Sequence, residues 1–176
     1  ELIKSKDEKD AVNQVLNDLG MKKRPNQAAA FLYKAVNALK ENGVLGVVLP
    51  SSILLADQYD VLRNRINEQT KLVSIGRLGN FIFENALTDV SFLMLKKTRD
   101  YQMSPQTIWC RNIENAAYEA IKDWRKMQYD NRTSCIQQNY NIYIPNNFPQ
   151  VRKTWKTIPQ KDDKFVRDLQ ERVNIG

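Results

Sequence analysis

The chain begins with two segments in which apolar residues recur at helical spacing. Within residues 1–25, the apolar residues on one helical face are Ala11, Val12, Val15, Leu16 and Leu19. Within residues 26–41, they are Phe31, Leu32, Ala35, Val36 and Leu39. Asn26 stands where an N-cap belongs, and Gly43 follows as a C-terminal signal. The pattern predicts a short amphipathic helix followed by a longer one, with Phe31 in the core.

An uninterrupted apolar run at residues 44–49 follows the second helix and ends at Pro50. Its side chains are aliphatic on both faces, which is typical of a strand in the middle of a parallel sheet covered by helices on both sides. A helix that leads directly into such a strand is half of a βαβ unit. We therefore expect an α/β fold.

A third helix and two more strands are predicted next. Asp57 is placed to cap the helix, and its inner face carries Val61, Leu62 and Ile66. Arg63 and Arg65 are expected on its outer face. Apolar strands follow at residues 71–77 and 90–96. The connection between them is short and has no helical period, so an antiparallel pair is expected rather than a crossover.

The pattern loosens beyond residue 97. A short strand is expected at residues 107–110, a helix at 113–127 and an alternating segment at 136–144. Residues 145–159 contain three prolines and resemble a linker, and a last amphipathic helix starts near Phe165. The predicted division is a helical lead-in at 1–25, a main unit at 26–100, its extension at 101–145, and a linker with a helix at 146–176.

The composition excludes several kinds of chemistry. The chain of 176 residues contains no histidine, which removes Ser-His and Cys-His catalysis and the usual zinc-ligand sets. Its acidic residues form no recognisable metal site or acid/base pair, so no metal is expected. Two cysteines without a CxxC motif favour a reducing cytoplasm. The longest apolar run is far short of the ~20 residues of a membrane span, and no signal peptide opens the chain, so no membrane is expected.

Positive charge is concentrated in the second half of the chain. The formal net charge is +7, of which residues 1–90 carry +1 and residues 91–176 carry +6. Such a bias is consistent with a polyanionic partner, because neutralised phosphates supply affinity that does not depend on sequence. A solvated surface without any ligand explains the same charge.

Two motifs stand in order within residues 26–97. The first is FLYKAVNALKENG at 31–43, followed by a strand that ends in LPSS at 49–52. The second is LGNFIFENALTDVS at 78–91, followed by an apolar strand. Together they resemble the second half of the catalytic domain of adenine-specific DNA methyltransferases. The similarity is greatest to the large type II restriction–modification enzymes in which cleavage and methylation share one polypeptide.

The resemblance implies a partial Rossmann-like sheet of an S-adenosylmethionine-dependent methyltransferase, with a helical or extended C-terminal extension. It also implies that a target adenine is flipped out of the duplex, because its exocyclic amine is buried in the base stack. The family's Asn-Pro-Pro-Tyr motif and glycine-rich cofactor turn do not occur in this sequence. We therefore expect a piece of a larger enzyme, without a catalytic residue of its own and inactive in isolation.

Phe83 is the residue to which the resemblance assigns a function. In the family, a phenylalanine at the matching position packs against the extruded adenine, and such stacking is worth about 1–3 kcal/mol per base. The alternative is a core residue that folds the loop back on the sheet. The neighbouring Phe81 is expected in the core.

Pro50, Ser51 and Ser52 are expected at the cleft, because ligands bind at the carboxyl ends of strands in open α/β sheets. The two hydroxyls either face the cofactor or DNA, or cap the next turn. Asp89 is expected to fix its loop through backbone hydrogen bonds.

Basic residues in two places are candidates for contact with the DNA backbone. One set lies at strand ends and the other interleaves positive charge with a tryptophan, a mixture that suits a nucleic-acid groove. The candidates are Arg77, Lys96, Lys97, Arg152, Lys153, Trp155 and Lys156. For the strand-end residues the alternative is a solvated rim, and for Trp155 it is a hydrophobic anchor between domains.

The sequence thus predicts part of a site-specific DNA methyltransferase of a restriction–modification system. The expected cofactor of the full-length enzyme is S-adenosylmethionine, and the expected partners are double-stranded DNA and the rest of the polypeptide. A truncated sheet would expose a strand edge, so self-association is also expected. The alternatives are a methyltransferase that acts on RNA or protein, and a non-catalytic module for DNA binding or subunit contact.

Overall fold

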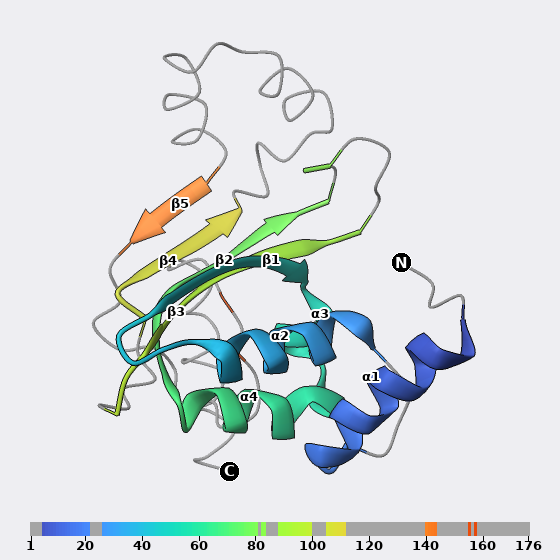
Figure 1. The fold of residues 1–176 in the computed structure, drawn as a ribbon. Helices are drawn as coiled ribbons and strands as arrows, with labels where there is room; N and C mark the ends of the chain where they lie inside the picture. Colours follow the sequence, from blue (N-terminus) through green and yellow to red (C-terminus); the bar gives the residue numbers. More distant parts are fainter. Residues whose placement is uncertain are drawn as a thin grey trace, which may run out of the picture.

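The computed structural model describes residues 5–21, 26–80, 82–83, 88–99, 105–111 and 140–143, together with Trp155 and Thr157. Its elements follow the chain in the order shown in Figure 1. They are α1 (Lys6–Asp18), α2 (Gln27–Ala38), β1 (Val44–Pro50), α3 (Ser52–Leu55), the 3-10 turn η1 (Asp57–Tyr59), α4 (Asp60–Asn67), β2 (Thr70–Gly79), β3 (Val90–Lys97), β4 (Thr107–Arg111) and β5 (Tyr140–Tyr143).

The strands form a mixed sheet in the order β1-β3-β2-β4-β5. β3 lies between β1 and β2 and is antiparallel to both. β4 is parallel to β2, and β5 is antiparallel to β4. The predicted antiparallel pair is therefore confirmed. Because β3 separates them, β1 and β2 run in the same direction, and their carboxyl ends share one end of the sheet.

The helices α2, α3 and α4 lie together on one side of this sheet in Figure 1. Aliphatic side chains fill the space between the two layers and are almost fully buried, which is the main source of stability in such a fold. The helices contribute Leu32, Val36, Leu62 and Ile66, and the sheet contributes Leu49, Ile75, Leu93 and Leu95.

The aliphatic sequence of β1 predicted a place in the middle of the sheet, but β1 does not lie there among the described strands. It is the edge strand of the described sheet and pairs only with β3. Leu49 points into the core, whereas Val44 and Val48 on the other face are exposed, Val48 by 45%. An aliphatic run indicates that both faces of a strand suit apolar surroundings. It does not indicate which of the two faces other described elements cover.

The first two helices begin as their sequences predict. The Ser5 hydroxyl accepts a hydrogen bond from the Glu8 amide in a capping box, and the Asn26 side chain accepts one from the Ala29 amide at 3.0 Å. The expectation that Phe31 lies in the core is wrong, because its side chain is 56% exposed. The buried face of α2 is instead formed by Ala29, Ala30, Leu32 and Val36.

The phase of α4 differs from the prediction. Asp57 belongs to η1 rather than capping the helix, and the N-cap Tyr59 makes no side-chain capping bond. The predicted core residues Leu62 and Ile66 are fully buried, but Val61 is 42% exposed and Arg63, expected outside, is 2% exposed. Arg63 donates to the oxygens of Ile53 and Ala56 and pairs with Asp60. Burial lowers the pKa of Arg63, and Asp60 opposes this shift.

The remaining expectations can be compared with the structure only at the described residues. The strand at residues 107–110 is confirmed as β4, and β5 falls within the alternating segment. The helices expected at 113–127 and near Phe165 lie outside the described residues. Among the helices that are described, none is long and apolar enough to cross a membrane.

Candidate functional site

The candidate site lies at the end of the sheet where β1 and β2 finish and β3 begins. Pro50 and Gly79 are both register partners of Val90, so the three strand ends form one row. The segment that follows β1 and the segment that follows β2 both start from this row. In open α/β sheets, ligands bind at the carboxyl ends of the strands. The topology therefore places both predicted motifs at the same end of the sheet.

Phe83 lies in the loop between β2 and β3, and its side chain is 51% exposed. A half-exposed ring does not fit the alternative of a core residue. Whether the ring contacts a base stays a prediction. Phe81, which was expected in the core, lies outside the described residues.

Four polar side chains join the ends of these strands, and we call Ser51, Arg77, Asp89 and Ser91 the polar clamp. The Ser51 hydroxyl donates to Asp89 Oδ1 at 3.0 Å, and the Ser51 amide donates to the Asp89 carbonyl at 2.9 Å. Arg77 donates to Asp89 Oδ2 from Nε at 2.9 Å and from Nη2 at 2.5 Å. The Ser51 and Ser91 hydroxyl oxygens lie 2.7 Å apart.

The direction of the serine–serine bond follows from proton counting. A hydroxyl has a single proton to donate, and a carboxylate accepts only. Because the Ser51 proton goes to Asp89, Ser91 is the donor to Ser51. The two buried serine side chains are therefore engaged within the protein. The capping role expected from sequence is wrong for Ser51, whose hydroxyl makes no capping bond and binds a side chain 38 residues away. Its place facing a cofactor or DNA stays a prediction.

The neighbours of Ser51 are placed differently. Ser52 is exposed and begins α3, and Pro50 is half-buried at the end of β1. The prediction that Asp89 fixes its loop is confirmed for its backbone carbonyl. The sequence did not reveal that both carboxylate oxygens take part as well, because their partners Ser51 and Arg77 are distant along the chain.

The structure does not bring together the basic candidates that it describes. Arg77 lies at the site but is bound to Asp89. Lys96 and Lys97 lie at the opposite end of β3 from Phe83, and the Lys97 ammonium donates to the Val36 carbonyl and to Gln69 Oε1. Arg152, Lys153 and Lys156 lie outside the described residues.

Trp155 is a structural anchor rather than an exposed ring. Its side chain is 2% exposed, and its amide donates to the Leu54 carbonyl at 2.9 Å. The indole is therefore not accessible to a DNA backbone, contrary to its place among the predicted contacts. Burial of the apolar ring against α3 explains why a tryptophan stands there.

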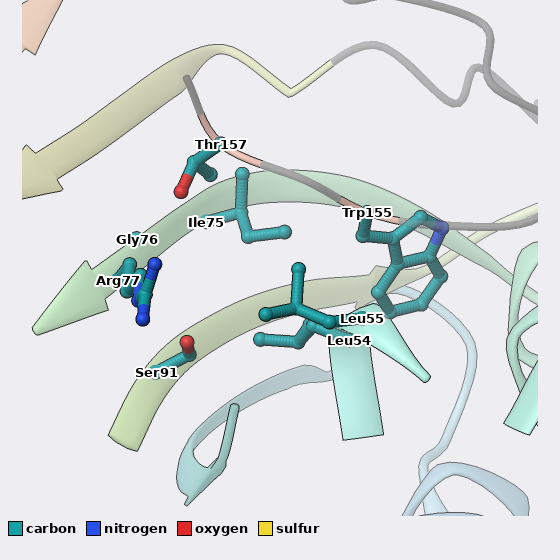
Figure 2. Close-up of a pocket in the computed structure, with 8 residues that line it drawn as sticks. All are labelled: Leu54, Leu55, Ile75, Gly76, Arg77, Ser91, Trp155 and Thr157. Carbon is teal, nitrogen blue, oxygen red and sulfur yellow. The ribbon is translucent and has the colours of Figure 1, made fainter. Parts of the chain in front are cut away.

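A small pocket lies beside this anchor, on the helix-covered side of the sheet. Figure 2 shows Trp155 near Leu54 and Leu55 at one end, and Arg77 and Ser91 at the other. Its remaining lining residues are Ile75, Gly76 and Thr157. No carboxylate is among its described lining residues. The described residues also contain no group of side chains suited to a metal ion.

Comparison with known proteins identifies similar sequences. The profile of the family described as N-6 DNA Methylase matches residues 3–166. The Type II restriction enzyme and methyltransferase RM.Eco57I of Escherichia coli is 29% identical over 99 residues, which are 54% of this chain and 8% of that protein. The chain thus spans about a twelfth of the curated relative that it matches.

Two solved structures share the fold. The DrdV–DNA complex superimposes with a TM-score of 0.51 and 13% identity, over 86% of this chain and 16% of that one. The type IIG restriction endonuclease BpuSI superimposes with a TM-score of 0.51 and 12% identity, over 90% of this chain and 20% of that one. At these identities, the likeness concerns the fold alone.

Proposed function

This chain belongs to the N-6 DNA methylase family, and on this premise we propose that the full-length protein methylates the exocyclic amine of adenine in DNA, as part of a restriction–modification system. The observation that carries the proposal for this chain is the exposed Phe83, on a loop anchored where β1 and β2 end. The match to a type II restriction enzyme and methyltransferase supports the restriction–modification context.

We propose that Phe83 stacks on the target adenine after the base has left the duplex. The amine is enclosed by the neighbouring bases until the adenine leaves the DNA duplex. Extrusion costs the adenine its stacking on those bases, and the enzyme must compensate for this loss. An aromatic ring on the protein restores about 1–3 kcal/mol per base. The half-exposed ring of Phe83 has a free surface for such a contact.

We propose S-adenosylmethionine as the methyl donor, since the family uses it. When bound, this cofactor supplies an electrophilic methyl group. The described residues alone do not fit it, because the pocket beside Trp155 has no carboxylate and the hydroxyl of Ser51 is engaged by Asp89. We therefore assign no cofactor contact to them and derive no chemical step from them.

We propose double-stranded DNA and the rest of the polypeptide as partners, in the cytoplasm. The similarity of fold to a protein solved as a DNA complex, DrdV, supports DNA as the substrate. We further propose that the isolated chain self-associates, because β1 is an unpaired edge within the described sheet and its outer face exposes Val44 and Val48.

A methylation assay on the full-length gene product tests this proposal. Labelled S-adenosylmethionine and duplex DNA are supplied to the wild type, to Phe83→Ala and to Val61→Ala. Val61 is a control of similar exposure on α4, away from the loop. We expect label on adenine, at least a tenfold loss for Phe83→Ala, and no loss for Val61→Ala.

The other results separate the alternatives. Activity that Phe83→Ala leaves intact would keep the enzyme class and remove the stacking role. Label that enters RNA or protein but never DNA would favour a different substrate. Absence of transfer to any of the three would favour a non-catalytic module.

A further inference from the structure

We propose that Asp89 is a positioning residue for the target base: by binding Ser51 and Arg77, it fixes the end of the loop that holds Phe83 against the adenine. This inference rests on the proposed function, because it assigns a role to a group beside the base-binding ring. Asp89 is not proposed as a catalytic residue, since both of its carboxylate oxygens already accept hydrogen bonds from the protein.

The loop is held at two points, and they differ in kind. At its start, Gly79 has a φ of 82°, which favours glycine, and follows a register shift between Arg77 and Gly79. At its end, Asp89 immediately precedes β3 and is bound to the segment after β1. The start is therefore fixed by the backbone, and the end is fixed by the polar clamp.

The two oxygens of Asp89 hold different elements. Oδ1 accepts from Ser51, which follows β1, and Oδ2 accepts from Arg77, which belongs to β2. A single carboxylate thus sets the loop relative to both strands whose carboxyl ends border the site. Hydrogen bonds to a charged acceptor are stronger and more directional than neutral ones.

The exposure of the Arg77–Asp89 ion pair indicates that this pair acts on geometry more than on global stability. The side chain of Arg77 is 52% exposed and that of Asp89 is 27% exposed. Ion pairs that reach solvent contribute little to the free energy of unfolding, because water and salt screen them. A small displacement of a substrate-positioning group, in contrast, lowers rates by up to about 100-fold. Loss of this ion pair should therefore affect turnover before it affects folding.

The test uses the full-length gene product with Asp89→Asn, which keeps the shape of the side chain and removes its charge. Glu68→Gln is the matched control, because Glu68 is also a carboxylate paired with an arginine, Arg65, but lies on the surface after α4. Ser51→Ala removes the Oδ1 bond by a second route. The measurements are kcat, the KM for DNA and for S-adenosylmethionine, the melting temperature, and fluorescence of 2-aminopurine at the mapped target adenine.

We expect Asp89→Asn and Ser51→Ala to lower kcat about 10- to 100-fold and to reduce the 2-aminopurine signal of base extrusion. For both variants the KM for S-adenosylmethionine should match that of Glu68→Gln, and the melting temperature of Asp89→Asn should match it as well. Ser51→Ala also removes the acceptor of the buried Ser91 hydroxyl, so its melting temperature should be lower. In the Phe83→Ala background, Asp89→Asn should cause little further loss, since both substitutions remove the same contact.

Three results would overturn the inference. One is an Asp89→Asn enzyme with the kcat of Glu68→Gln while Phe83→Ala is impaired, which leaves the proposed function intact. Another is a full additional loss of kcat in the double variant, which would separate Asp89 from Phe83. A wild type that does not methylate DNA would instead overturn the proposed function and this inference with it.

Discussion

Arg63 donates a hydrogen bond from Nη1 to the main-chain oxygen of Ile53 at 2.8 Å, and the same nitrogen reaches the Ala56 oxygen at 2.9 Å. The side chain thereby satisfies two carbonyls at the end of the short helix α3 and joins this helix to α4. Asp60, which lies on α4 as Arg63 does, compensates the charge of the guanidinium. A buried arginine thus holds together the two α-helices that follow β1.

We expect Arg63→Met to destabilise the chain. Methionine fills a similar space but leaves the Ile53 and Ala56 oxygens without this donor, and a buried carbonyl that loses its partner costs about 1–3 kcal/mol. The loss in free energy of unfolding should be about 2–4 kcal/mol, measured by urea denaturation of the 176-residue chain. Arg65→Met is the control, since Arg65 forms an exposed pair with Glu68, and should change stability by less than about 1 kcal/mol. Equal effects of the two substitutions would contradict the role of Arg63.

Gly76 lies where two aromatic rings close over the sheet. A Cβ built on Gly76 would lie 2.4 Å from Trp109 Cβ and 2.5 Å from Phe92 Cε1. Phe92 and Trp109 contact each other edge to face, with ring centroids 5.8 Å apart. Gly76→Ala should therefore force the rings apart and cost about 1–3 kcal/mol. Gly46→Ala on β1 is the control, because a Cβ there meets nothing within 4 Å.

Urea denaturation of both glycine variants measures this difference. A Gly76→Ala protein as stable as Gly46→Ala would show that the two rings move aside without cost. The pairing of Phe92 and Trp109 across β2 would then not be a tight contact.

Trp155 provides a further test, because the sequence left open a nucleic-acid contact and a hydrophobic anchor, and the structure buries its side chain. Removal of its buried indole by Trp155→Ala should lower the free energy of unfolding by about 3–5 kcal/mol. Thr157→Ala, at the rim of the same pocket, should have a much smaller effect. If Trp155→Ala instead weakened DNA binding with unchanged stability, the indole would be a nucleic-acid contact as the sequence pattern predicted.

The parts of the fold that the sequence predicted correctly depend on neighbouring residues. The Asn26 cap bonds to the Ala29 amide three residues away, and β2 and β3 pair across one short loop. Local patterns determine such features. Local patterns did not identify Phe83, because two phenylalanines in a loop do not by themselves indicate which one is exposed. Only the resemblance to the methyltransferase family singled it out.

The parts that it missed depend on distant residues. The Ser51 hydroxyl finds Asp89 only because β3 inserts between β1 and β2, which no local pattern specifies. Arg63 is buried with its guanidinium bound to the Ile53 and Ala56 oxygens, whereas an arginine on a short polar helix is ordinarily exposed. A buried cation needs fixed acceptors, and these come from the end of a different helix.

The exposed face of β1 leads to a last prediction, on association of the isolated chain. Val48 is 45% exposed on an edge strand, and Val44 and Met94 are exposed on the same side. Edge strands with apolar side chains pair with one another unless a charge prevents it. Sedimentation velocity of the 176-residue chain should therefore show association that increases with concentration, and Val48→Lys should suppress it.

Val61→Lys is the matched control, because Val61 is exposed to a similar degree on α4. This substitution adds the same charge away from the strand edge. If both lysines suppress association equally, net charge rather than the β1 edge is responsible. A wild-type chain that stays monomeric at the highest soluble concentration would show that the exposed edge does not pair with a second copy. Suppression by Val48→Lys alone would place the contact at β1.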